Sequence, residues 1–181
     1  MTTFNPDRSI GRWISMAYRL MTRVLNRELE PLGLSITQAF FLIVLFFQDG
    51  QSQEELSTIL QIDKANTARA LSKLESLGLI TRELAPHDRR TKLVQPTDKA
   101  RAIQPKFFKI FTHMSEHISE RFTSEEQDIF LQMLAELVDS LIEQIAEAEG
   151  KEKSDICREM CPRKKNILWH PWSSLGDPAA E

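Results

Sequence analysis

The sequence predicts a mainly helical protein that carries one small β-hairpin. Apolar residues recur at every third or fourth position over most of the 181 residues, which is the period of amphipathic helices. Ser, Thr or Asp precedes most of these helical segments, where a side chain can cap the first turn. Short alternating segments occur between residues 79 and 95, as expected for two strands. A chain of this length suits one globular domain, or a small module joined to a helical dimerisation element.

Two helices are predicted in the first fifty residues. The first spans residues 10–29, with one apolar face interrupted by arginines, and Pro31 and Gly33 end it. Ser35 and Gln38 have the spacing of a capping box and begin the second helix. Its apolar run at residues 39–47 predicts deep burial, and Gly50 ends it.

A pair of shorter helices is predicted next. Ser52 and Glu55 form a second capping-box pattern, and Leu56, Ile59 and Leu60 are the expected inward residues. Asp63 is placed to cap the following helix, which runs to Leu77, and Gly78 suits a left-handed C-terminal cap. This helix has an expected buried stripe of Ala70, Leu71 and Leu74 with Thr67, and an opposite polar face of Lys64, Asn66, Arg69 and Lys73.

A hairpin and two long helices follow. Residues 79–84 and 90–95 alternate around a basic turn at residues 86–89. Thr97 caps a long helix that contains Pro105, where a kink is expected, and Thr123 begins the last one. The broad apolar stripe of that last helix predicts packing on the first helix and on a second subunit. Residues 150–181 are predicted to form a tail or arm of unknown role.

Charge is segregated along the chain, although the net charge is only -3. Residues 51–101 carry 9 Lys and Arg against 7 Asp and Glu, whereas residues 102–150 carry 3 against 10. A protein needs positive charge only where it touches nucleic acid, so a mildly basic module beside an acidic body is compatible with DNA binding. The weak excess of positive charge also suits a winged-helix module that binds protein, which is the main alternative.

The order helix, turn, helix, hairpin within residues 52–95 is that of a winged helix-turn-helix. The predicted fold is therefore mainly α with a small β-hairpin wing, plus N- and C-terminal dimerisation helices at 1–34 and 97–149 around a DNA-binding region at 35–96. The second helix would enter the major groove, where Asn reads adenine and Arg reads guanine, each worth roughly 1–3 kcal/mol. The wing would reach the minor groove, with Asp88 orienting an arginine. The candidate DNA-binding residues are Ser52, Gln53, Lys64, Asn66, Thr67, Arg69, Lys73, Arg89, Arg90 and Lys92.

Four motifs carry a family resemblance. The segments Ser52-Gln-Glu-Glu-Leu56, Ile62-Asp-Lys-Ala-Asn-Thr-Ala-Arg-Ala70, Leu74-Glu-Ser-Leu-Gly-Leu-Ile80 and Asp88-Arg-Arg-Thr-Lys92, in this order, resemble the MarR family of bacterial transcription regulators. The resemblance extends from about Ile10 to Glu149. It implies a homodimer on a pseudo-palindromic operator, repression as the usual output, and release by a small ligand or by cysteine oxidation. It also places the family's Asp-x-Arg wing motif on Asp88 and Arg90, whereas Ala65 stands where many members have serine.

Other candidate sites have simpler structural interpretations. Trp13, Phe40, Phe107, Phe111 and His113 are candidates for an effector pocket, but aromatic residues at helical spacing usually belong to a core. Cys157 and Cys161 are a candidate redox pair, or with His170 part of a metal site, although ordinary free thiols fit the spacing better.

The remaining expectations are absences. No grouping of catalytic residue types or phosphate-binding loop is found, so neither an enzyme nor a cofactor is predicted. The longest apolar run has nine residues, too few for a membrane span, and the N-terminus lacks the pattern of a signal peptide. The two cysteines are too few for a disulfide framework. These features predict a cytoplasmic protein.

Overall fold

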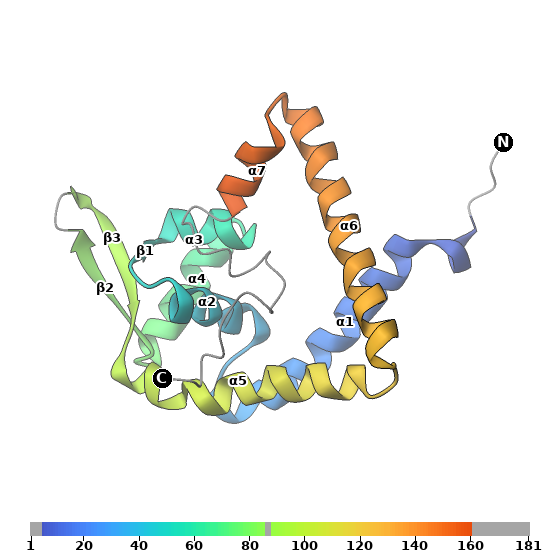
Figure 1. Ribbon diagram of the computed structural model, residues 1–181. Coiled ribbons are helices and arrows are strands. Elements are labelled where there is room, and N and C mark those ends of the chain that lie inside the picture. The colour runs from blue at the N-terminus through green and yellow to red at the C-terminus, as the bar shows by residue number, and fades with distance from the viewer. Residues whose placement is uncertain (1–4, 86–87, 161–181) are drawn as a thin grey trace.

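The computed structural model describes residues 5–85 and 88–160, with the backbone alone at 88–90 and 160. Within these residues the chain is mostly helical and has one small sheet (Figure 1). The elements, in order, are the short helix η1 (Pro6–Arg8), α1 (Ile10–Leu29), η2 (Glu30–Leu32), α2 (Ile36–Phe47), β1 (Gln51–Ser52), α3 (Gln53–Leu60), α4 (Lys64–Ser76), β2 (Ile80–Ala85), β3 (Asp88–Pro96), α5 (Asp98–Ser119), α6 (Ser124–Glu149) and α7 (Lys153–Met160).

Side-chain caps fix the starts of the main helices. Ser35, Ser52 and Thr123 each form a complete capping box, in which the side chain accepts a backbone N–H three residues later and a Gln or Glu side chain returns the contact. Asp63 and Thr97 accept a backbone N–H in the same way at the starts of α4 and α5. These caps confirm the predicted starts of the five helices. The starts could be predicted because each cap involves residues within one turn.

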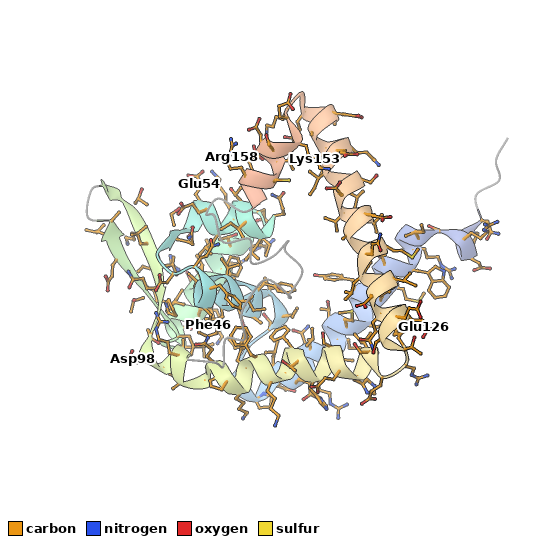
Figure 2. The ribbon with its side chains drawn as sticks, in the orientation of Figure 1. Phe46, Glu54, Asp98, Glu126, Lys153 and Arg158 are labelled. Carbon is orange, nitrogen blue, oxygen red and sulfur yellow. The ribbon has the colours of Figure 1, made fainter. Side chains whose placement is uncertain are left out.

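The core is centred on α2. Phe41, Leu42 and Leu45 are completely buried and pack with residues from α3, α4, β3 and α5. Phe107 of α5 is also completely buried and meets Phe46 of α2 edge to face, with ring centroids 5.6 Å apart (Figure 2). This packing joins α3, α4 and the middle of α5 to α2 in one core.

The sheet has three antiparallel strands in the order β1-β3-β2. The hairpin prediction is confirmed, but its turn was placed wrongly: β3 begins at Asp88, which pairs with Ala85, so the connection is shorter than the predicted turn at 86–89. The register shifts between Leu84, which pairs with Lys92, and Ala85, which pairs with Asp88. The third strand, β1, was not predicted, and it pairs Gln51 with Val94.

The long C-terminal helices extend away from the core (Figure 1). α5 forms one side of a triangle, α6 turns back from its far end, and α7 returns to α3. The main helical neighbour of α6 within the chain is α7, whereas α1 packs on α5. The apolar stripe of α6 consequently leaves Ile129, Met133 and Leu141 exposed. The expected packing of α6 on the first helix and on a second subunit stays a prediction.

Helix α7 corrects the expectation that the chain beyond residue 150 is only a tail or arm. Gly150 adopts a left-handed conformation at the end of α6, which lets the chain reverse direction. Ile156 of α7 then packs into a small separate cluster with Ile142 and Ala146 of α6. Lys153 of α7 also forms ion pairs with Asp139 and Glu143 of α6 (Figure 2).

No single helix among the described residues is long and apolar enough to cross a membrane, although the bent pair Ile10–Leu32 and Ile36–Phe47 reaches the threshold by length and composition together.

Candidate nucleic-acid interface

Helix α4 is anchored by one face and exposes the other. Thr67, Ala70, Leu71 and Leu74 are buried, which confirms the predicted stripe. The opposite side is exposed, and we call it the polar face of α4; it consists of Lys64, Asn66, Arg69 and Lys73. Because the buried stripe packs on α2 and α3, the polar face has a fixed direction relative to the whole core.

The turn between α3 and α4 uses an uncommon backbone conformation. Gln61 has φ 52°, in the left-handed region that glycine usually occupies, and its side chain donates to the carbonyl of Thr58. The Ser57 hydroxyl donates to the carbonyl of Ile62 at 2.6 Å, and the Thr67 hydroxyl donates to the same oxygen at 3.3 Å. These contacts fix the angle between the two helices.

Thr67 requires a correction. Its side chain has no exposed surface, and its hydroxyl donates to the turn. Residue 67 lies on the inner side of α4, so it cannot contact DNA through its side chain without leaving the core. Its role is to join α4 to the preceding turn.

Two of the cations on the α3–α4 pair already have partners within the chain. The ammonium group of Lys64 lies 2.8 Å from the carboxylate of Glu54 on α3. This hydrogen bond lowers the pKa of Glu54 and raises the pKa of Lys64, so both groups stay charged at neutral pH. Arg69 donates to the side-chain oxygen of Asn66 at 2.7 Å.

Asp63 does more than cap the helix. One carboxylate oxygen accepts the backbone N–H of Asn66 at 2.9 Å, and the other accepts the side-chain N–H of Asn66. The backbone hydrogen bond and then the side-chain one lower the pKa of Asp63, so the group is ionised at neutral pH. A negative charge at this end of a helix also complements the helix dipole.

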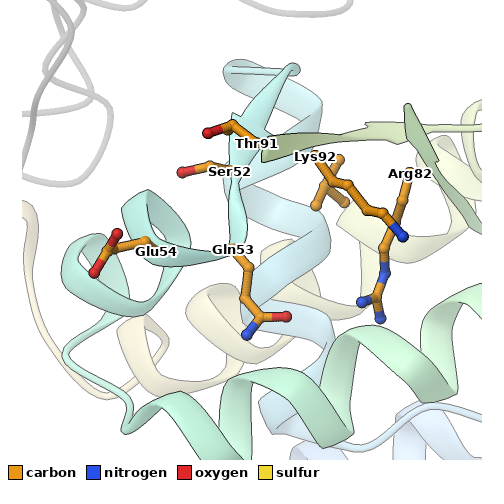
Figure 3. Close-up of a pocket in the computed structure, with 7 residues that line it drawn as sticks. Ser52, Gln53, Glu54, Arg82, Thr91 and Lys92 are labelled. Carbon is orange, nitrogen blue, oxygen red and sulfur yellow. The ribbon is translucent and has the colours of Figure 1, made fainter. Parts of the chain in front are cut away.

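A cavity lies between the start of α3 and the hairpin, with a volume of about 240 Å³ (Figure 3). Figure 3 shows Arg82 and Lys92 beside each other, with Gln53 facing them. Two cations and the first turn of a helix can accept an anionic group such as a backbone phosphate. The residues that line the cavity are Ser52, Gln53, Glu54, Arg82, Thr91, Lys92 and Val94.

Arg82 was missed by the sequence analysis. Its guanidinium forms an ion pair with Glu75 at 3.2 Å and donates to the Ser72 hydroxyl, and both partners lie on α4. Arg82 therefore connects the hairpin to α4. Arg82 pairs with Val94, which places it on the same face of the sheet as Lys92. This relationship follows from the strand register, which the spacing of residues in the sequence does not give.

The other predicted interface residues differ in how far the structure describes them. Ser52 and Gln53 begin α3 beside the cavity, and Lys92 is exposed on β3. The side chains of Asp88, Arg89 and Arg90 lie outside the described part of the chain, so the predicted basic tip and its brace stay predictions.

The five candidates for an effector pocket are not alike. Phe107 is a fully buried core residue, and Phe111 packs on it with ring centroids 5.2 Å apart. Phe40 packs against the same cluster. Trp13, by contrast, is half exposed on α1, where its ring N–H donates to the Asp7 carbonyl, and His113 is exposed on α5. The three phenylalanines therefore follow the core interpretation.

The cysteine candidates are only partly described. Cys157 lies exposed on α7, whereas Cys161 and His170 fall outside the described residues. Between residues 5 and 160, apart from the gap at 86–87, no group of three or more His, Cys, Asp or Glu side chains is arranged to hold a metal ion.

Known proteins with similar sequences are bacterial regulators. The MarR family model matches residues 32–91. The HTH-type transcriptional regulator YybA of Bacillus subtilis (strain 168) is 30% identical over 125 residues, which cover 69% of this chain and 83% of that protein.

Known structures agree with these sequence matches. A MarR transcriptional regulator from Methanosarcina mazei Go1 is 33% identical, with a TM-score of 0.67 over 73% of this chain and 96% of the other. The transcriptional repressor CouR, solved bound to a 23-mer DNA duplex, is 26% identical, with the same TM-score over 76% of this chain and 99% of its own. These relatives belong to a family of transcription regulators that are not enzymes, which confirms the prediction that the chain is not an enzyme. The family model, the relative in Bacillus subtilis and the similar structures together establish that the chain belongs to the MarR family of DNA-binding transcription regulators.

Proposed function

We propose that the chain is a repressor that binds a pseudo-palindromic operator as a homodimer, through regions 35–96, and pairs through regions 1–34 and 97–149. The polar face of α4 carries this proposal, because a firmly anchored helix with Lys64, Asn66, Arg69 and Lys73 on its exposed side suits the major groove. The hairpin beside it brings Arg82 and Lys92 to the same side and would lie at the minor groove. The likeness to CouR, solved with a DNA duplex, supports this use of the surface.

Exposed apolar side chains support the homodimer. A soluble monomer rarely exposes many large apolar residues on adjoining helices, and a second copy with the same surface would bury them. Two α4 helices in such a dimer would reach successive major-groove faces roughly 34–36 Å apart. The exposed residues on α1, α5, the α5–α6 corner and α6 include Ile10, Trp13, Ile14, Leu20, Met21, Val24, Ile118, Phe122, Ile129, Phe130, Leu131, Met133, Leu141 and Ile145.

Binding of the full chain to a pool of duplexes, measured at several salt concentrations, tests the DNA-binding surface. Affinity should fall steeply with salt, because lysines and arginines release counterions from the phosphates. Arg69→Ala should relax sequence preference, whereas Arg90→Ala should weaken binding to most sequences. Arg121→Ala, at the exposed corner between α5 and α6, serves as the control. Binding that is insensitive to salt, or unchanged in both interface variants, would instead favour a protein-binding module.

The homodimer is tested by sedimentation of the full chain. Leu141→Glu places a charge among the exposed apolar residues of α6 and should shift the protein toward the monomer, with weaker operator binding. Gln132→Glu adds the same charge at an exposed polar position of α6 and should leave the dimer intact. A wild-type chain that sediments as a monomer at micromolar concentration would contradict this part of the proposal.

Release from the operator by a small molecule completes the proposal, and the family resemblance is what supports it. A screen for compounds that lower operator affinity of the wild-type chain tests it. A peroxide-dependent loss of binding that Cys157→Ser abolishes would point to redox release instead.

A further inference from the structure

Asp63, Asn66 and Arg69 form a row of hydrogen bonds along the exposed start of α4. The side-chain N–H of Asn66 donates to Asp63, and the side-chain oxygen of Asn66 accepts from the Arg69 guanidinium at 2.7 Å. The three residues are three positions apart, the spacing of neighbours on a helix surface. Both polar atoms of the Asn66 side chain therefore have partners within the helix.

The chemistry of the two end groups fixes the direction of this row. An ionised carboxylate only accepts hydrogen bonds, and a guanidinium only donates them. The amide of Asn66 must therefore turn its NH₂ toward Asp63 and its oxygen toward Arg69. The reverse orientation would set two acceptors against each other at one end and two donors at the other.

This arrangement separates the roles of Asn66 and Arg69. An asparagine reads adenine by placing both its N–H and its oxygen on the edge of the base. Asn66 would have to break contacts at both ends to do so. Arg69 donates one N–H to Asn66, and its guanidinium has further N–H donors for the O6 and N7 acceptors of guanine.

We propose that Arg69 reads a guanine in each half-site, and that Asp63 and Asn66 are positioning residues that hold its guanidinium instead of contacting a base. This inference rests on the proposed entry of α4 into the major groove. It replaces the expectation that Asn66 reads adenine.

Solvent exposure determines whether this row of hydrogen bonds affects the stability of the fold or the choice of DNA sequence. All three side chains are exposed in the DNA-free chain, where water competes for the same groups and the contacts add little stability. A duplex that covers the polar face excludes this water and strengthens hydrogen bonds between charged and polar groups. The row should therefore affect the choice of sequence more than the stability of the fold.

The experiment is selection of bound duplexes from a random-sequence pool by the full chain, followed by affinity measurements on single-base variants of the selected duplex. Wild-type protein should select a guanine that Arg69→Ala no longer prefers, a loss of roughly tenfold or more in discrimination. Asp63→Asn keeps an effective helix cap but places an NH₂ group where the second carboxylate oxygen was. It should lower the guanine preference by roughly three- to tenfold, a fraction of the value of the arginine–guanine pair.

Asn66→Ala should weaken preference at the same guanine and at no other base. Ser76→Ala, at the exposed end of the same helix, should leave selection unchanged, and melting temperatures should show that every variant is folded. Loss of a selected adenine in Asn66→Ala, with the guanine preference intact, would show that Asn66 reads a base and would overturn the proposal. An unchanged guanine preference in Asp63→Asn would do the same.

Failure of the proposed function would give a different result in the selection experiment from failure of this assignment alone. In that case the wild-type chain itself selects no duplex, so both the function and this assignment fall together. If only the variants behave contrary to expectation while the wild type selects an operator, the function stands and the assignment alone is wrong.

Discussion

The ammonium group of Lys64, in the first turn of α4, lies 2.8 Å from the carboxylate of Glu54 on α3. Both side chains are about three-quarters exposed, so the ion pair contributes little to folding. Its position matters more, because it places a negative charge beside the first cation of α4. In the proposed complex with DNA, the phosphates and Glu54 would compete for the same ammonium group.

Replacing Glu54 with Gln should strengthen DNA binding. The change frees Lys64 and removes a charge that repels phosphate, so affinity should rise several-fold. The slope of log affinity against log salt should steepen by up to about 0.9, the value for one further phosphate contact. Glu116→Gln, which removes an exposed charge on α5, is the control and should change neither quantity. Equal effects of the two substitutions would indicate that only net charge matters.

Acid should weaken the start of α4 by protonating Asp63. The backbone hydrogen bond from Asn66, and then its side-chain hydrogen bond, lower the folded pKa of Asp63 below that of an ordinary aspartate. A lowered carboxyl pKa gives stability that is present above the unfolded pKa and is lost as the pH falls through the folded pKa. The carboxyl chemical shift of Asp63, followed by NMR, should have its midpoint below that of an unperturbed aspartate. Asp63→Asn should remove this part of the acid sensitivity, and a midpoint at or above the unperturbed value would contradict the capping role.

Replacing the buried Gln51 with Met should stabilise the protein. Neither side-chain polar atom of Gln51 has a hydrogen-bond partner among the described residues, although the residue is completely buried. An unsatisfied buried amide costs about 1–3 kcal/mol, and Met has a similar length without the polar group. The free energy of unfolding in urea should therefore rise by about 1–2 kcal/mol. Gln132→Met on exposed α6 should change it by less than about 0.5 kcal/mol. A lower stability of Gln51→Met would show that the amide is satisfied in solution.

Replacing Ile156 with Asp should detach α7. Ile156 is buried against Ile142 and Ala146, and a carboxylate there would lose its hydration without gaining a partner. Trypsin should cleave after the basic residues of α7 roughly tenfold faster, because cleavage follows the population of the detached state. Ser154→Asp adds the same charge at an exposed position of α7 and is the control. Similar cleavage of both variants would mean that Ile156 does not hold the helix.

The starts of the helices could be predicted because their determinants are local. Ser35, Ser52, Asp63, Thr97 and Thr123 each satisfy a backbone group within three residues, so spacing alone identifies them. The buried stripe of α4 was equally accessible, since a helix with a fixed period presents one face to the core.

The features that escaped prediction depend on contacts distant in the sequence or on unusual backbone conformation. β1 is only two residues long and exists through its pairing with β3. Gln61 adopts a left-handed conformation without the Gly or Asn that would have signalled it. The contacts of Arg82 with Glu75 and Ser72 require the hairpin to fold back on α4.

Two details of the α4 side chains also required the structure. Thr67 was assigned both to the buried stripe of α4 and to the DNA-binding residues, and its complete burial supports the first assignment. Asn66 is a common base-reading type, but its hydrogen bonds to Asp63 and Arg69 appear only once three side chains are placed together.

The pairing of Gln51 with Val94 also bears on how the protein folds. It joins the two ends of the segment that contains α3, α4 and the hairpin, and closing a loop of this length costs about 3 kcal/mol in chain entropy. The helices within the loop can form from neighbouring residues, whereas this strand pair can form only after the ends meet. We therefore expect β1 to join the sheet late, in the step that commits the recognition helix and the hairpin to a single cooperative unit.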